Sequence, residues 1–184
     1  MTMTPRLRKF ALSAHLTFSV GWIGAVIAYL ALVVAAMTSQ DSRTLPAVWI
    51  AMELIGWYVI VPLALAALLS GLVMALGTPW GLFRHYWVLL SLVLTILATV
   101  VLLVHMPDVS SLADIAQKAE GARLDGLGGD LFHPGVGLVV LLVIQVLNVY
   151  KPRGMTPYGQ RKLREQRRPR PSEPHPEPAE VTTT

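Results

Sequence analysis

The sequence predicts an all-α, polytopic membrane protein: a four-helix transmembrane bundle with a short extracytoplasmic amphipathic helix. Composition is the first reason, because 54% of the 184 residues are hydrophobic, 14% are charged, and the mean hydropathy is +0.56. The second reason is that four apolar stretches follow one another, at residues 10–37, 47–76, 86–105 and 132–150. Each approaches or exceeds the roughly 20 residues that a helix needs to cross a bilayer.

The distribution of Lys and Arg predicts the orientation of these spans. Most of the 15 basic residues precede the first span, connect the second to the third, or follow the fourth; the exceptions are Arg43, Lys118 and Arg123. Because cytoplasmic loops carry the excess of Lys and Arg, both termini are predicted to be cytoplasmic. We expect residues 1–150 to form the transmembrane domain, and residues 151–184 to form a tail that is basic at first and then Pro-rich and disordered.

The basic part of the tail also predicts a partner. The run that begins at Lys151 and ends at Arg170 should lie on anionic lipid headgroups, with about 1 kcal/mol from each nearby basic side chain. This topology accounts for the net charge of +4, so no nucleic-acid partner is expected. On the first span, Gly21 and Gly24 share a stripe of small residues, which favours close helix packing, a homo-oligomer or another membrane protein as partner.

The first span carries the most distinctive polar stripe. Successive helical residues lie about 100° apart, so His15, Ser19 and Trp22 fall on one face. Since an ionisable residue at membrane depth is costly, His15 is a functional hypothesis. Two readings are open: an axial ligand of haem b, with His85 or His105 as partner, or a buried histidine that hydrogen-bonds a neighbouring helix.

The other three spans also contain polar residues and one helix breaker. Pro62 should kink the second span, because proline removes a backbone hydrogen bond from a helix interior. The residues expected to be polar and buried inside the bundle are Glu53, Ser91, Thr95, Gln145 and Asn148. For Glu53 two roles are open: a hydrogen bond to a neighbouring helix, or a group that carries a proton or binds a cation.

The loop between the third and fourth spans is long enough to hold structure. Ser111 and Asp114 match a Ser-x-x-Asp helix start, which predicts the short amphipathic helix at the outer surface. His105 and His133 flank this loop, and with Glu53 they form a candidate metal site of two histidines and one carboxylate. The alternative is that both histidines mark helix ends at the membrane interface.

Missing residue types and motifs exclude several kinds of chemistry. The chain has no Cys, which excludes disulfides, thiolate metal sites, iron–sulfur clusters and a cysteine nucleophile. It also contains no Gly-rich phosphate loop after a strand, no Gly-x-Ser-x-Gly and no His-Glu-x-x-His. We therefore assign no catalytic residue, and these observations favour a non-catalytic protein.

Three short motifs resemble those of a family of small, uncharacterised bacterial integral membrane proteins with four helices. They are GTPWGL at residues 77–82, YWV at residues 86–88 and VYKPRG at residues 149–154. The resemblance covers about residues 9–160. It implies the bacterial cytoplasmic (inner) membrane and brings no established activity.

The first span also resembles a second, more distant group. The pattern His15-x6-Trp22-x-Gly24 is similar to the copper-resistance D-type membrane domain and its relatives, among them the membrane protoporphyrinogen oxidase that carries haem b. In that oxidase a first-helix histidine is implicated in haem binding, a role that the resemblance gives to His15. A third-helix lysine also matters there, and this chain departs from the pattern, with Ser91 near the expected place.

Three functions from different classes follow. The one we expect is a non-catalytic accessory or scaffold protein. The alternative is a membrane redox protein that binds haem b or a metal through His15. The third is a small proton-coupled transporter that uses Glu53, although four helices offer little room for a solute path.

Overall fold

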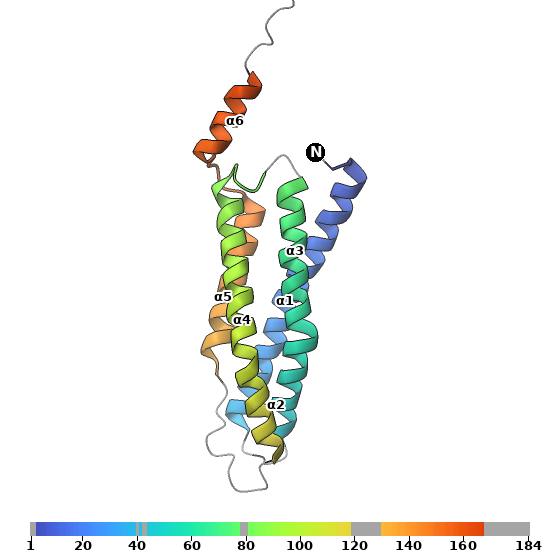
Figure 1. The fold of residues 1–184 in the computed structure, drawn as a ribbon. Coiled ribbons are helices and arrows are strands. Elements are labelled where there is room, and N and C mark those ends of the chain that lie inside the picture. The colour runs from blue at the N-terminus through green and yellow to red at the C-terminus, as the bar shows by residue number, and fades with distance from the viewer. Residues whose placement is uncertain (1–2, 40, 42–43, 78–80, 119–129, 168–184) are drawn as a thin grey trace, which may run out of the picture.

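The computed structural model describes residues 3–39, 41, 44–77, 81–118 and 130–167. Within them the chain is all-α, which confirms the predicted fold class (Figure 1). The elements are α1 (Pro5–Thr38), α2 (Thr44–Ile55), the π-helical turn η1 (Gly56–Ile60), α3 (Val61–Gly77), α4 (Tyr86–Lys118), α5 (Phe132–Tyr150) and α6 (Pro157–Arg167). Four segments are long and apolar enough to span a membrane: α1, the continuous α2–η1–α3, α4 and α5.

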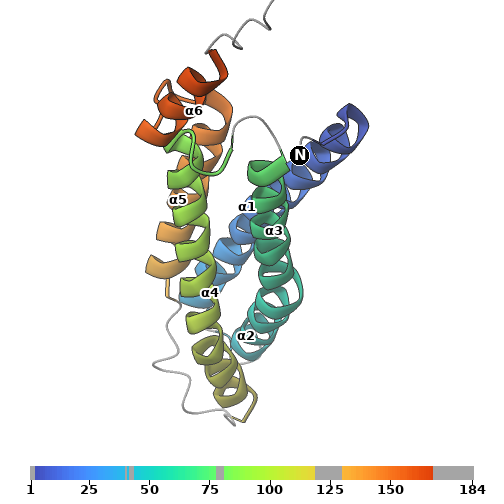
Figure 2. The same cartoon turned by 45° about the horizontal axis from the view of Figure 1, so that its top comes forward.

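The four spans form a closed ring of neighbours. α1 packs against α2 and α3 on one side and against α5 on the other, and α4 packs against the same elements from across the bundle. We call the end where α1 begins and α5 ends the tail end, because α6 lies there, and the opposite end the loop end (Figure 1). At the tail end α1 leans away from α4 and α5 (Figure 2).

The outer faces of the spans are apolar and exposed. Within their most apolar windows, only 28% of the residues are buried in α1, 28% in α2–η1–α3, 17% in α4 and 6% in α5. Exposing such apolar surfaces to water would be unfavourable in free energy, whereas lipid tails solvate them. Since each helix satisfies its own backbone hydrogen bonds, the bundle has the form that a bilayer requires.

The second span contains a π-helical turn just before Pro62, where the sequence predicts a kink. The helix widens into the π turn η1 just before the proline, and the Val61 N–H donates to the Gly56 carbonyl five residues back. In a regular α-helix the pyrrolidine ring would meet the carbonyl of Tyr58, four residues earlier. The widened turn also brings Trp57 to α4, where its indole N–H donates to the Ser110 hydroxyl at 2.9 Å.

The prediction of a separate helix at the outer surface is wrong in one respect. Its residues are helical, but they continue α4 through Pro107 as far as Lys118, and the Ser111 hydroxyl donates to the Asp108 carbonyl instead of capping a new helix. The reason is packing, because this part of α4 lies against α2. It buries one apolar stripe there, formed by Met106, Val109, Ala113 and Ala116. From the sequence, we expect this helix to end at Gly121 or in the Gly-rich run 125–129, and these residues lie outside the described ones.

The tail contains a helix that we did not expect. α6 begins at Pro157, whose fixed φ suits a first helical position, and the Thr156 hydroxyl accepts the Gly159 N–H at 3.1 Å as its cap. Thr156 also donates its N–H to the Arg84 carbonyl at 3.0 Å and its hydroxyl to the Phe83 carbonyl, so α6 is fixed to the start of α4. The disorder predicted for the Pro-rich tail falls on residues 168–184, outside the described residues.

Candidate functional site

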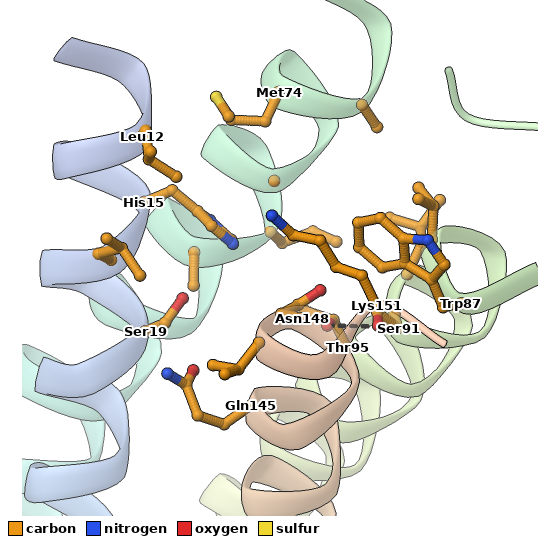
Figure 3. Close-up of a pocket in the computed structure, with 18 residues that line it drawn as sticks. Leu12, His15, Ser19, Met74, Trp87, Ser91, Thr95, Gln145, Asn148 and Lys151 are labelled. Carbon is orange, nitrogen blue, oxygen red and sulfur yellow. Dashed lines mark hydrogen bonds between the residues drawn. The ribbon is translucent and has the colours of Figure 1, made fainter. Parts of the chain in front are cut away.

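Polar side chains from α1, α4 and α5 converge on one cavity near the tail end, which α3 also lines (Figure 3). The cavity has a volume of about 180 Å³. Its polar and aromatic lining residues are His15, Ser19, Trp87, Ser91, Thr95, Gln145, Asn148 and Lys151. The polar residues predicted inside the bundle on three separate spans therefore face a shared space.

His15 lies on α1 and is held by α3. Its Nδ1 is 3.0 Å from the Ser70 hydroxyl, and that hydroxyl donates to the Ala66 carbonyl at 2.6 Å. A serine hydroxyl that gives its one proton to Ala66 can only accept from His15, so this arrangement corresponds to the tautomer with its proton on Nδ1. Gly71 makes room for the ring, because a Cβ there would lie 3.1 Å from the His15 Cε1.

Ser91 is the buried polar group of this cavity that lacks a partner. It is 7% exposed, and its hydroxyl oxygen has no hydrogen bond to any described residue. On the same helix, the Thr95 hydroxyl donates to the Ser91 carbonyl at 2.7 Å, and the Thr99 hydroxyl donates to the Thr95 carbonyl at 2.8 Å. A buried hydroxyl without a partner costs about 1–3 kcal/mol, so a polar molecule in the cavity would be stabilised there.

Lys151 completes the lining from the end of α5. Its backbone is left-handed, with φ of 45° and ψ of 63°, and its N–H donates to the Leu147 carbonyl at 3.0 Å. This conformation costs a residue with a Cβ about 1–2 kcal/mol, and the side chain extends into the cavity beside Trp87 and Asn148 (Figure 3). Among the described lining residues Lys151 is the one formally charged side chain, and none is acidic.

The histidines predicted as partners of His15 lie elsewhere. His85 pairs with Met155 in an isolated β-bridge, and it does not line the cavity. His105 lines a different cavity together with Tyr29, which lies about 21 Å along α1 from His15 at 1.5 Å per residue. One haem iron could therefore not be held between His15 and His105 in this arrangement.

The metal site predicted at the loop end stays a prediction, but the structure does bring its two histidines together. The rings of His105 and His133 stack with centroids 4.5 Å apart at 20°. The carboxylate beside them is Asp130, not Glu53, because Asp130 stands at the start of α5 where its side chain meets His133. The spacing Asp130-x-x-His133 was the sequence signal that could have found it.

The remaining predictions about buried polar residues are partly correct. Ser91 is buried, whereas Thr95, Gln145 and Asn148 are half-buried because they border the cavity and not the packed core. Glu53 is also half-buried and lines neither cavity. Lys151 was missed as a site residue because, in the sequence, it reads as the first residue of a basic tail.

Three comparisons with known proteins, against family models, curated proteins and solved structures, found no match. The resemblance to the family of small bacterial membrane proteins and to the haem-carrying oxidase therefore stays a prediction.

Proposed function

We propose that this chain is a non-catalytic binding protein of the membrane, whose tail-end cavity takes the anionic head of an amphipathic molecule. The observation that carries the proposal is the cavity lining. It combines one ammonium, from Lys151, with the unpartnered buried hydroxyl of Ser91, and it contains no acidic side chain among the described residues. This narrows the accessory role expected from the sequence to a binding role.

A carboxylate or a phosphate fits the donors around the cavity. The Lys151 ammonium and the Ser91 hydroxyl can donate to its oxygens, and so can the amide groups of Gln145 and Asn148. Hydrogen bonds that involve an ionised group are roughly twice as strong as neutral ones, which favours an anion over a neutral polar group. Basic residues of the surrounding surface, such as Arg84 and those of α6, would attract anions to this end.

The rest of the lining fits an acyl chain. Leu12 and Leu16 of α1, Leu68 and Met74 of α3, and Val149 of α5 supply apolar surface beside the polar groups. Leu12 and Leu16 are both exposed on the outer face of the bundle as well as lining the cavity, so an acyl chain could extend along them toward lipid. An amphipathic anion therefore uses both parts of the lining.

The size of the cavity favours a head group over haem. Pockets for small molecules usually measure about 300–1,000 Å³, and this one measures about 180 Å³. Haem would require the helices to separate, and among the described residues His15 is the one histidine that lines the cavity. A visible spectrum of the purified protein tests this alternative, since haem ligation requires a Soret band that His15→Ala abolishes.

Fluorescence quenching tests the proposal. The full chain is placed in nanodiscs of zwitterionic lipid and titrated with a brominated fatty acid, whose bromines quench tryptophan emission on contact. We expect saturable quenching that is largely lost in Trp87→Phe, because Trp87 lines the cavity. The brominated methyl ester lacks the negative charge, so it should only dissolve in the bilayer and give quenching that rises linearly with its concentration.

Two matched lysines provide the control. Lys151→Gln should weaken the saturable binding by at least about tenfold, as expected for loss of an ion pair of 1.4 kcal/mol or more. Lys162→Gln, on exposed α6, should leave it unchanged. Brominated phosphatidylglycerol in place of the fatty acid shows whether the head is a phosphate or a carboxylate. Equal binding of acid and ester, or equal binding by both lysine variants, would refute the proposal.

A further inference from the structure

A second cluster of chemically active side chains lies at the loop end, independent of the tail-end cavity. His105 comes from α4, His133 from the first turn of α5, and Asp130 directly precedes α5. One ligand atom from each of the three lies within 4.8 Å of the others. We propose that His105, Asp130 and His133 form a binding site for a divalent transition-metal ion, with Zn²⁺ as the ion that fits the donor set.

The donors suit such an ion. Imidazole nitrogen and carboxylate oxygen are the ligands that Zn²⁺ takes at about 2.0–2.2 Å, so neighbouring donors on a tetrahedral ion lie roughly 3.3 Å apart. His105 Nε2 lies 4.0 Å from the nearer Asp130 oxygen, so this pair has to close by less than about 1 Å. Because the side chains of His105 and His133 are 26% and 48% exposed, each ring has room to rotate out of the stack toward an ion.

The carboxylate is already oriented for this role. Asp130 Oδ1 accepts the Phe132 N–H at 2.9 Å, which fixes the side chain at the N-terminus of α5. The second oxygen, Oδ2, accepts a hydrogen bond from His133 Nδ1 and faces His105 Nε2, so a bound ion would take the place of the His133 proton. Burial raises the pKa of the Asp130 carboxyl, but the hydrogen bonds from His133 and from the Phe132 N–H outweigh it and hold that pKa below its ordinary value. The group is therefore an anion at neutral pH, as a metal ligand must be.

There is also space for a further ligand. A cavity of about 90 Å³ borders both histidines and is otherwise lined largely by apolar residues, with Tyr29 and Trp22 of α1 on its wall. A water molecule occupies about 30 Å³ of liquid, so one fits beside the histidines. Three protein ligands and a water are the usual set of an open zinc site.

Calorimetry of the chelator-treated full chain in mild detergent tests the site, with Zn²⁺ as the titrant. We expect one ion per chain. His133→Asn, His105→Asn and Asp130→Asn should each weaken binding by at least about tenfold, since even the outer partners of metal ligands contribute 10–100-fold. Two matched controls should bind as the parent does: His85→Asn at the tail end, and Asp114→Asn, whose carboxylate pairs with Lys118 at 2.5 Å.

Co²⁺ supplies a second readout that does not depend on affinity alone. Bound to nitrogen and oxygen ligands in a tetrahedral site, it should give visible absorption bands in the parent protein that the three site variants lose. Thermal unfolding without metal shows whether each variant is folded, and asparagine keeps a polar side chain of similar reach at each position. Binding of Zn²⁺ that is unsaturable, or equally tight in folded site variants and controls, would overturn the proposal.

Discussion

The two halves of the bundle are built in different ways. The loop-end half is packed: the largest fully buried side chains, Val33, Trp49, Met52 and Met106, all belong to it and come from α1, α2 and α4. The tail-end half instead encloses the cavity, where few large side chains are buried and polar groups from three spans face one another. One half thus holds the helices together while the other leaves space between them.

The packed half explains how the open half can exist. Between helices in lipid the hydrophobic driving force is weak, so close packing and interhelical hydrogen bonds supply the association. Gly56 in the π turn allows Met106 to lie against the backbone, and Trp57 donates to Ser110 across the same interface. With the spans fixed there, α1 can lean away at the tail end (Figure 2) without the bundle coming apart.

The largest contrast should come from two methionines, one in each half. Met106 is 1% exposed, and Met106→Ala should lower the free energy of unfolding by about 2 kcal/mol. This is near the low end for a core truncation, because a side chain gains little from leaving lipid for an equally apolar core. Met74→Ala, in the cavity lining, should lower it by less than about 1 kcal/mol. Reversible unfolding in mixed micelles measures both. Equal losses would show that the two halves do not differ in packing.

Two glycines test the same contrast by adding one methyl group. In Gly56→Ala the new Cβ would lie 2.7 Å from the Met106 Sδ, so the buried methionine has to move, at a cost of about 1–2 kcal/mol. In Gly71→Ala the Cβ would lie 3.1 Å from the His15 Cε1, and the ring can shift into the cavity, so the loss should stay below about 0.5 kcal/mol. The same unfolding assay applies. A larger loss for Gly71→Ala would reverse the assignment of the packed half.

Ser91 allows a test in which removing a group helps stability. Ser91→Ala removes a buried hydroxyl that has no protein partner, so the ligand-free protein should lose no stability and could gain up to about 1 kcal/mol. Thr99→Val is the control, because Thr99 is as buried but its hydroxyl donates to the Thr95 carbonyl; it should lose about 0.5–1 kcal/mol. A clear loss in Ser91→Ala would show that its hydroxyl is satisfied within the protein.

The smallest effect should be a dependence on pH at the loop end. The pKa of Asp130 is lower in the folded chain than its ordinary value of 3.8, so the folded state binds this proton more weakly than the unfolded state. The resulting stability is present above about pH 4 and is lost as the pH falls through the lowered pKa. Melting temperatures of the parent and of Asp130→Asn from pH 3 to 7 measure it. If both fall equally below pH 4, Asp130 is not the group responsible.

Much of the architecture could be predicted because hydropathy and helical periodicity are local properties. The fourth predicted span coincides with α5, and polar residues predicted inside the bundle on three spans line the cavity. α1 starts five residues before its predicted span, since Arg6, Arg8 and Lys9 form helices well although they are not apolar.

What could not be predicted depends on contacts between distant residues. Nothing in the local pattern showed that α4 would continue through Pro107, because its reason is the burial of the following turns against α2. Lys151 enters the cavity through a left-handed backbone that hydropathy does not register. By contrast, the pair Thr156-Pro157 was a readable N-cap and first-turn signal for α6, although the capped helix depends on Phe83 and Arg84 for its anchoring.

Native mass spectrometry tests most directly whether the open half is a binding site for an amphipathic anion. The protein is purified from its membranes in mild detergent and released in the gas phase with whatever it retains. We predict one anionic amphiphile bound per chain in the parent and in Lys162→Gln, and its loss in Lys151→Gln. A parent protein that carries no such molecule, or a Lys151→Gln variant that carries it equally, would contradict the proposed role of the cavity.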